Sequence, residues 1–475
     1  MSTLLSALTT KDSLTENGMA TNSTSNNSCV DLFFTIGASR KADRQDLINN
    51  FVKALEEDAL TAIKILFWAR DVRGGAGERK IFRDILNYLT ETRTELVSKN
   101  LHLVAEYGRW DDVLSLLGTK VENKVLELVK NALDNNNALC AKWLPRPNGK
   151  NVENKTKANI IRKFLGLSPK EYRKLISSKS KTVEQLMCSK NWLEIEYSKV
   201  PSKALSDYMK SFAKNDKVRF DEYLESVKNG EVKINASAVY PYDIVKNLKF
   251  GDTEGASVQW NALPNFMENS KEFVLPVVDV SGSMGIHSIS PSVNCMDVAI
   301  SLGLYISERN KGSFQDAFIT FSSFPQLQYL KGSLFERFQQ LATADWGMST
   351  NIEAVFNLIL NKAVTERVPQ SEMPTTILIL SDMEFDAASE NRNVSIQELI
   401  ESNYVKNGYQ IPKIVYWNLA SRNKNVPVKF TKTGTALISG FSPAILKNVL
   451  SGEKMDPVSI MNSVINSDRY SAITV

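Results

Sequence analysis

Apolar residues in the first third of the chain recur at the spacing of amphipathic helices. Two successive runs each place their apolar residues on one helical face: Leu47, Ile48, Phe51 and Leu55, then Ala62, Ile65, Leu66 and Ala69. The segment RDVRGGAGERK interrupts this pattern and lacks the Gly-Lys-Ser/Thr ending of a phosphate-binding loop, so it is interpreted as a turn between helices. Helix–turn–helix units of about 30–40 residues predict an all-α, HEAT-like helical-repeat domain over residues 29–250.

After Phe273 the pattern changes to an alternation of short apolar runs and helical segments. FVLPVVDV, DAFITFSS, TTILILSD and KIVYWNL are typical of strands, and helical stretches such as VNCMDVAISLGLYISER and STNIEAVFNLILNKAV separate them. This alternation predicts a doubly wound α/β domain with a parallel sheet over residues 272–475. Functional groups are then expected at the carboxyl ends of the strands.

Two shorter segments precede and follow the helical domain. Residues 1–28 are rich in Ser, Thr and Asn and are expected to form a flexible N-terminal arm, and residues 251–271 to form a linker between the two domains. The N-terminus has no basic start followed by an apolar run, and no window approaches the roughly 18–20 apolar residues of a membrane span. We therefore expect a cytoplasmic protein that does not engage a membrane.

The amino-acid composition limits the kinds of metal and catalytic site that the chain can form. Hydrophobic residues make up 43% of the chain and charged residues 23%, as in soluble globular proteins. The four cysteines are far apart in sequence and form no CxxC pair, which argues against a disulfide framework and a cysteine-based zinc site. Because the chain has only two histidines, His102 and His287, a histidine-rich metal centre is excluded and most histidine-based acid–base schemes are disfavoured.

Charge is distributed unevenly along the chain. The net charge is +4, but residues 141–233 contain 21 Lys plus Arg against 11 Asp plus Glu, interleaved with aromatic residues. Two interpretations stay open: amphipathic helices with aromatic cores and solvated lysines, or a basic surface for nucleic-acid phosphates. For the second, the candidate RNA-contacting side chains are Arg70, Arg73, Arg79, Lys142, Arg146, Arg162, Lys163, Arg173 and Lys174.

The strongest chemical signal is the sequence Asp279-Val-Ser281-Gly-Ser283, directly after the first predicted strand. One carboxylate and two hydroxyls in a tight turn are hard oxygen donors, suited to Mg²⁺ and unsuited to zinc. Thr350, at the start of a predicted helix, and Asp382, at the end of a later strand, are expected at the same sheet edge.

This pattern resembles the metal-ion-dependent adhesion site of von Willebrand factor A domains. The resemblance implies that Asp279, Ser281, Ser283, Thr350 and Asp382 bind Mg²⁺, or another hard divalent cation such as Mn²⁺ or Ca²⁺. It also implies an open coordination position for a partner's carboxylate. Where many A domains have Gly-Gly-Thr, this chain has Gly347-Met348-Ser349-Thr350, so Ser349 is the alternative ligand to Thr350.

No general base accompanies this site in the sequence. His287, four residues after Ser283, is the one candidate, and a lone histidine beside a metal loop is more often a surface group. We therefore expect a protein that is not an enzyme.

Longer segments extend the resemblance to the whole chain. They resemble a family of uncharacterised proteins from plants, bacteria and large DNA viruses, and include FWARDVRGGAGERKIFRDIL, YGRWDD, AKWLPRP, VPSKALSDYMKSF and INASAVYPYDIV. The order of a helical half followed by an A domain is also similar to the Ro autoantigen (TROVE) family, although Tyr240-Pro241-Tyr242 replaces the His-Pro motif of the Ro junction.

The Ro resemblance implies a ring of helical repeats that binds small noncoding or single-stranded RNA. The hypothesis is a noncatalytic binding protein that takes RNA on its basic helical domain and an acidic protein partner at a Mg²⁺ site. The alternative is a metal-dependent adhesion or assembly module that does not bind RNA.

Overall fold

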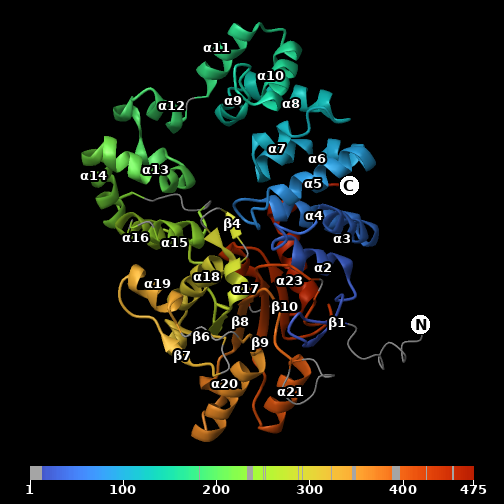
Figure 1. The fold of residues 1–475 in the computed structure, drawn as a ribbon, viewed down its shortest axis with the longest axis vertical. Helices are drawn as coiled ribbons and strands as arrows, with labels where there is room; N and C mark the ends of the chain where they lie inside the picture. Colours follow the sequence, from blue (N-terminus) through green and yellow to red (C-terminus); the bar gives the residue numbers. More distant parts are fainter. Residues whose placement is uncertain are drawn as a thin grey trace.

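A helical half precedes an α/β half in the computed structural model. The helices run up one side of the molecule and return down the other to the sheet (Figure 1). The structure describes residues 13–180, 182–232, 239–249, 251, 253–286, 288–290, 293–321, 324–344, 349–387, 396–423, 425–451 and 454–475.

The helical half consists of short amphipathic helices. Their bounds are α2 (Ser28–Ile36), α3 (Arg44–Glu57), α4 (Ala59–Arg70), α5 (Lys80–Thr92), α6 (Thr94–Tyr107), α7 (Trp110–Leu114), α8 (Glu122–Asp134), α9 (Ala138–Trp143), α10 (Val152–Phe164), α11 (Pro169–Lys179), α12 (Val183–Cys188), α13 (Ser202–Asn215), α14 (Lys217–Lys228), α15 (Pro241–Lys249) and α16 (Thr253–Asn261).

Polar side chains fix where several of these helices begin. The Asn27 side chain accepts a hydrogen bond from the Val30 amide at the start of α2. Ser168 and Glu171 form a reciprocal capping box at the start of α11. Such caps satisfy amides that the first helical turn leaves without a backbone partner, so short polar segments delimit the helices.

The α/β half is built on a six-stranded sheet with the order β10-β9-β8-β3-β6-β7. The strands are β3 (Val274–Val278), β6 (Ala317–Thr320), β7 (Leu327–Tyr329), β8 (Thr376–Ser381), β9 (Lys413–Asn418) and β10 (Thr435–Ser439). The helices of this half are α17 (Gly282–Ile286), α18 (Cys295–Arg309), α19 (Leu334–Ala342), α20 (Ile352–Glu366), α21 (Ile396–Lys406), α22 (Leu446–Val449) and α23 (Pro457–Ile465). Two small antiparallel pairs are separate: β1 (Ser13–Leu14) with β2 (Ala20–Thr21), and β4 (Ser288–Ser290) with β5 (Val293–Asn294).

The sheet is mixed, which corrects the prediction of a parallel sheet. Five strands run parallel, but β7 pairs antiparallel with β6 at the edge. Only six residues separate β6 from β7, whereas a parallel neighbour needs a crossover of a dozen or more residues. The short connection therefore decides the direction of the edge strand.

The two halves share one apolar core. Helix α2 packs against β10 and β9, and α23 packs against both β10 and α4. The helix end approaches the sheet so closely that a Cβ on Gly37 would lie 2.8 Å from the amide nitrogen of Gly440. Core residues from α2 to β10 accordingly form a single continuous cluster. The α/β half is thus packed directly onto the first helices of the chain.

The expected flexible arm and linker are both structured where they are described. Residues 13–28 contribute β1, β2 and buried side chains such as Met19 and Asn22, which corrects the prediction of a flexible arm. Asn22 hydrogen bonds with Val426 of the α/β half, so its polar side chain is satisfied by tertiary partners. Helix α16 lies within the expected linker and buries Trp260. Polar composition therefore misled the prediction for residues 13–28, and the expected linker contains a helix.

The C-terminal segment is tied to the helical half by a buried carboxylate. Asp71, fully buried after α4, forms an ion pair with Arg469, whose Nη2 lies 2.6 Å from Asp71 Oδ1. The Tyr470 hydroxyl donates to Asp71 Oδ2 at 2.9 Å. Because a buried charge is costly unless it is paired and hydrogen-bonded, these contacts hold residues 468–475 against α4 and α6.

We predict that Asp71→Asn lowers the free energy of unfolding by about 3 kcal/mol, because Arg469 and Tyr470 lose a buried charged partner. Urea unfolding followed by circular dichroism measures the change. Asp221→Asn is the control, since its partner Lys217 is 73% exposed and the pair is 2.5 Å long. The control should change stability by less than about 0.5 kcal/mol, and equal effects of the two substitutions would contradict the role of Asp71.

Candidate functional site

The central strands β3 and β8 bring Asp279 and Asp382 to the same edge of the sheet. The two strands are parallel neighbours, with Val278 opposite Leu380. Asp279 is the first residue after β3, and its amide donates to the Leu380 carbonyl at 2.9 Å. Asp382 is the first residue after β8. Register and strand direction therefore place both carboxylates at the carboxyl ends of adjacent strands, as the sequence predicted for this fold.

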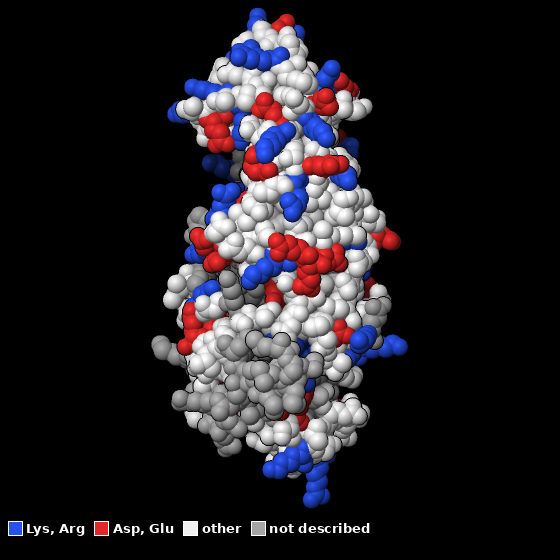
Figure 2. Space-filling view, turned by 90° about the vertical axis from the view of Figure 1, so that its right-hand side faces the viewer, with Lys and Arg blue, Asp and Glu red and all other residues white. Residues whose placement is uncertain are grey.

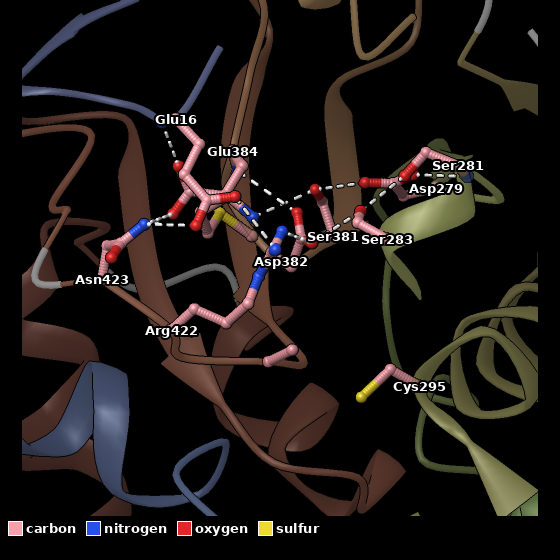
Figure 3. Close-up of polar contacts among 12 residues, drawn as sticks. Glu16, Asp279, Ser281, Ser283, Cys295, Ser381, Asp382, Glu384, Arg422 and Asn423 are labelled. Atoms are coloured by element: carbon pink, nitrogen blue, oxygen red, sulfur yellow. Dashed lines mark hydrogen bonds and ion pairs between the residues drawn. The ribbon is translucent and has the colours of Figure 1, made fainter. Parts of the chain in front are cut away.

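A chain of hydrogen bonds joins these carboxylates through the two serines (Figure 3). Ser283 Oγ donates to Asp382 Oδ2 at 2.8 Å, and the Ser281 and Ser283 hydroxyls lie 3.0 Å apart. The Ser281 amide donates to Asp279 Oδ1 at 2.9 Å, which folds the loop back over the strand end. Four of the five side chains predicted from the sequence are thus in one hydrogen-bonded cluster.

The two carboxylates are buried and repel each other. Asp279 is fully buried, and Asp382 and Ser281 are nearly so. Burial, followed by repulsion from the Asp382 carboxylate, raises the pKa of Asp279 to about 6. Two carboxylates held this close in a desolvated site are an environment in which a cation is favourable, because it offsets the repulsion that raises the pKa.

The fifth predicted residue, Thr350, lies on the neighbouring loop. It is 3% exposed, and its carbonyl accepts from the Asp386 amide at 3.1 Å, four residues beyond Asp382. The hydroxyl of Ser349, the alternative ligand, instead donates to Asp386 Oδ2 at 2.6 Å. Ser349 is therefore engaged by another carboxylate. Gly347 and Met348, from the same motif, lie outside the described residues.

The donor set fits a hard divalent cation. The cluster offers two carboxylates and the hydroxyls of Ser281 and Ser283, all oxygen donors of the kind that Mg²⁺, Mn²⁺ and Ca²⁺ take. Within the part of the chain that the structure describes, no group of three or more His, Cys, Asp or Glu side chains could hold a metal ion. Binding at this edge would therefore depend on hydroxyl and water ligands as well as on the two carboxylates.

Three further residues belong to this site and escaped the sequence analysis. Ser381 Oγ donates to Asp279 Oδ2 at 2.6 Å and orients that carboxylate. Arg422, in the loop after β9, pairs with Asp382 Oδ2 and, at 3.0 Å, with Glu16 Oε2. The Ser-Asp pair that ends β8 was a usable signal for Ser381. Arg422 and Glu16 carry no local motif, since tertiary packing alone brings them to Asp382.

Arg70 corrects the list of RNA candidates. It is 2% exposed and pairs with the fully buried Asp112, with Nη2 2.7 Å from Oδ2. Arg83 pairs with the other oxygen of Asp112 at 2.6 Å. Arg70 is thus a structural cation beneath the glycine-rich turn and is inaccessible to a phosphate. Arg73 and Arg79, on the same turn, are exposed.

The other candidate RNA-contacting residues lie on or near α10 and α11, and they differ in exposure and in their contacts within the protein. Residues 146–179 contain ten Lys plus Arg against two Asp plus Glu, so most of the excess charge of residues 141–233 lies in this segment. Lys163, Arg173 and Lys174 are exposed there, and Arg146 is exposed while bonding to Ser177. Arg162 is half-buried and bonds to Asn159, and Lys142 pairs with Glu184 at 2.7 Å. The accessible cations are therefore concentrated at α10 and α11.

Elsewhere in residues 141–233 the structure favours the amphipathic interpretation. Tyr197, Phe212 and Phe220 are buried in a separate small core, with Trp192, Tyr208 and Tyr223 packed against it. Many basic side chains are ion-paired there, including Lys199, Lys203, Lys217, Arg219 and Lys228. On the face that Figure 2 presents, basic and acidic side chains are interspersed over the helical half. The buried rings of Tyr197, Phe212 and Phe220 therefore serve packing and are not available to stack on bases.

Comparison with known proteins yields matches over both halves. Residues 15–157 and 137–273 match a domain of unknown function, DUF2828, and residues 274–471 match a second domain of unknown function, DUF7788. The boundary between the matches falls at the first residue of β3. The uncharacterized protein L728 of Acanthamoeba polyphaga mimivirus is 31% identical over 508 residues, which cover 95% of this chain and 87% of that protein.

The structure contains no helix, in the residues it describes, with the length and apolar character that a bilayer crossing requires. His102 lies exposed on α6, and His287, the one histidine near the metal loop, lies outside the described residues.

We predict that Arg70→Gln destabilises the fold by about 3 kcal/mol, because Asp112 stays buried with one fewer cationic partner. Arg79→Gln, on the same turn with a side chain 52% exposed, should cost less than about 1 kcal/mol. Chemical denaturation of both variants measures the difference. Equal, small decreases in the free energy of unfolding of the two variants would mean that Arg70 does not stabilise the buried Asp112 carboxylate.

Proposed function

This chain belongs to the family of proteins that carry the domain of unknown function DUF2828, and we propose that it is a noncatalytic, metal-dependent binding protein of Ro-like architecture. The proposal places Mg²⁺, or another hard divalent cation, at the edge of the sheet in a von Willebrand factor A-like adhesion site. The observation that carries it is the hydrogen-bonded cluster of Asp279, Ser281, Ser283 and Asp382 at the ends of β3 and β8.

Each residue has a defined part in this proposal. Asp279 and Asp382 supply the negative charge, and the Ser281 and Ser283 hydroxyls supply neutral oxygens. Thr350 is favoured over Ser349 as the fifth residue, because the Ser349 hydroxyl is engaged by Asp386. When bound, the cation would offer an open coordination position to a carboxylate of an acidic protein partner. Ser381 orients Asp279 from behind the cluster.

RNA binding is the second part of the proposal, and the basic segment around α10 and α11 supports it. Residues 146–179 contain ten basic residues against two acidic ones, and Lys163, Arg173 and Lys174 are exposed there. Phosphate contacts of this kind give affinity that falls steeply with salt. The alternative is an adhesion module without RNA binding, in which α10 and α11 contact another protein.

We predict that Mg²⁺ raises the melting temperature of the wild-type protein relative to EDTA. At a concentration about 100 times Kd, binding to the folded state should add about 2.7 kcal/mol of stability. Asp279→Asn should abolish this gain, because it removes one of two carboxylate ligands. Differential scanning fluorimetry with and without EDTA measures it. A wild-type melting temperature that is indifferent to Mg²⁺, Mn²⁺ and Ca²⁺ would contradict the metal site.

Thr350→Ala and Ser349→Ala form a matched pair for the same assay. Thr350→Ala should reduce the Mg²⁺-dependent gain, whereas Ser349→Ala should preserve it, because the Ser349 hydroxyl is bonded to Asp386. The opposite order would assign the ligand to Ser349. A pull-down tests the acidic protein partner. We expect the wild-type protein to retain the partner in Mg²⁺ and to lose it in EDTA, and we expect Asp279→Ala not to retain it.

We predict that the double variant Lys163→Gln/Lys174→Gln weakens binding of a small RNA and lowers the slope of log K against log salt by about 1–2. Filter binding at several salt concentrations measures both quantities. Lys406→Gln/Lys447→Gln, two exposed lysines of the α/β half, is the control and should leave binding unchanged. Wild-type affinity that is absent, or unresponsive to salt, would reject RNA as the ligand.

A further inference from the structure

Arg422 links the candidate metal site to the N-terminal segment of the chain. One nitrogen of its guanidinium pairs with Asp382 Oδ2, the oxygen that also accepts from Ser283. Its other terminal nitrogen lies 3.0 Å from Glu16 Oε2. Figure 3 shows the guanidinium between Asp382 and the N-terminal Glu16. A cation supplied by the protein therefore already occupies part of the environment of Asp382.

The N-terminal segment, residues 13–22, is bound to the two loops that leave this edge of the sheet. On the loop after β8, the Thr15 hydroxyl donates to the Phe385 carbonyl at 2.6 Å, and the Glu16 amide donates to Glu384 Oε2 at 2.6 Å. On the loop after β9, Asn22 and Val426 exchange backbone hydrogen bonds. The segment thus depends on the position of the same loops that carry Asp382 and Arg422.

Glu384 is a further buried carboxylate at the junction between residues 13–22 and the loops after β8 and β9. It is 3% exposed, and burial raises its pKa, while the Glu16 amide, Asn423 and Asn425 donate hydrogen bonds to its carboxylate. Arg422 brings a positive charge to this junction through its ion pairs with Asp382 and Glu16. Any change in the position of Arg422 alters the balance between these carboxylates.

A divalent cation at Asp279 and Asp382 would compete with Arg422. Both are positive, both use Asp382, and like charges a few ångströms apart in a buried site repel strongly. The Asp382 oxygen shared by Arg422 and Ser283 becomes available to an ion or its water when the guanidinium leaves.

We propose that Arg422 is an internal competitor of the divalent cation, so that filling the metal site displaces Arg422 from Asp382 and Glu16 and loosens residues 13–22 from the sheet edge. This inference rests on the proposed metal site. Because coupling between two binding events is reciprocal, loosening the segment must in turn favour the cation. The N-terminal segment is then a latch whose closed state is the cation-free protein.

The first test measures Mg²⁺ affinity by isothermal titration calorimetry. Arg422→Gln should tighten Mg²⁺ binding about tenfold, because a like charge is removed beside the ion. Arg422→Lys, which keeps the charge, should stay closer to wild type. Arg337→Gln is the matched control: Arg337 is 22% exposed against 23% for Arg422, and pairs with Asp316 at 2.8 Å. The control should not change the affinity.

Glu16→Gln separates the latch from simple electrostatics. Removing a negative charge near a cation would by itself weaken Mg²⁺ binding. The latch predicts the opposite, a several-fold tightening, because displacing Arg422 no longer breaks its ion pair with Glu16. Weaker binding by Glu16→Gln would overturn the proposal.

The second test is hydrogen–deuterium exchange of the wild-type protein with and without Mg²⁺. The amides of Glu16 and Asn22, both hydrogen-bonded to the loops, should exchange faster with Mg²⁺, and those of β10 should not change. Unchanged or slower exchange at residues 13–22, in a protein that binds Mg²⁺, overturns the latch and leaves the proposed function standing. Mg²⁺ binding absent from both wild type and Arg422→Gln overturns both. Binding seen solely in Arg422→Gln supports the competition but contradicts a metal-occupied site in the wild-type protein.

Discussion

The parallel pairing of β3 with β8 is the constraint on which the candidate site depends. An aspartate directly follows each strand, and the register that sets Val278 opposite Leu380 brings Asp279 and Asp382 out at one edge. A shift of one residue would turn every side chain of a strand to the other face of the sheet. Both strands are fully buried, so apolar packing against α18 and the neighbouring strands holds this register. Packing of the sheet therefore offsets the electrostatic repulsion between the two carboxylates.

Buried charges elsewhere in the molecule join segments that are remote in sequence. Asp71 holds Arg469 and Tyr470, Asp112 holds Arg70, and Asp382 holds Arg422. In each case a desolvated carboxylate is matched by a guanidinium that arrives from another element, which suits the planar, multiply donating Arg side chain. The pairs of Asp71 with Arg469 and of Arg422 with Asp382 and Glu16 hold residues 468–475 and 13–22 against the body of the protein.

The basic character of residues 141–233 divides into two parts once the chain is folded. Around α13 and α14, lysines pair with nearby acids and the aromatic rings fill a small core, so the charge is largely consumed within the protein. Around α10 and α11, two acidic residues face ten basic ones, and the excess charge remains at the surface. The same composition therefore supports a structural role in one part and an electrostatic one in the other.

Local patterns determined much of this protein. The helices from Leu47 onward, the strands that precede Asp279 and Asp382, and the serines of the loop after Asp279 can all be predicted from periodicity and residue type. Tertiary structure alone decided that Arg70 is buried, that residues 13–28 are ordered where described, that β7 reverses, and that Arg422 and Glu16 meet Asp382. The physical reason is the separation in sequence over which each interaction acts. Helical periodicity and capping depend on residues a few positions apart. Ion pairs and burial depend on which distant segments pack together. A charged or polar residue in the sequence therefore does not show which residue it will contact.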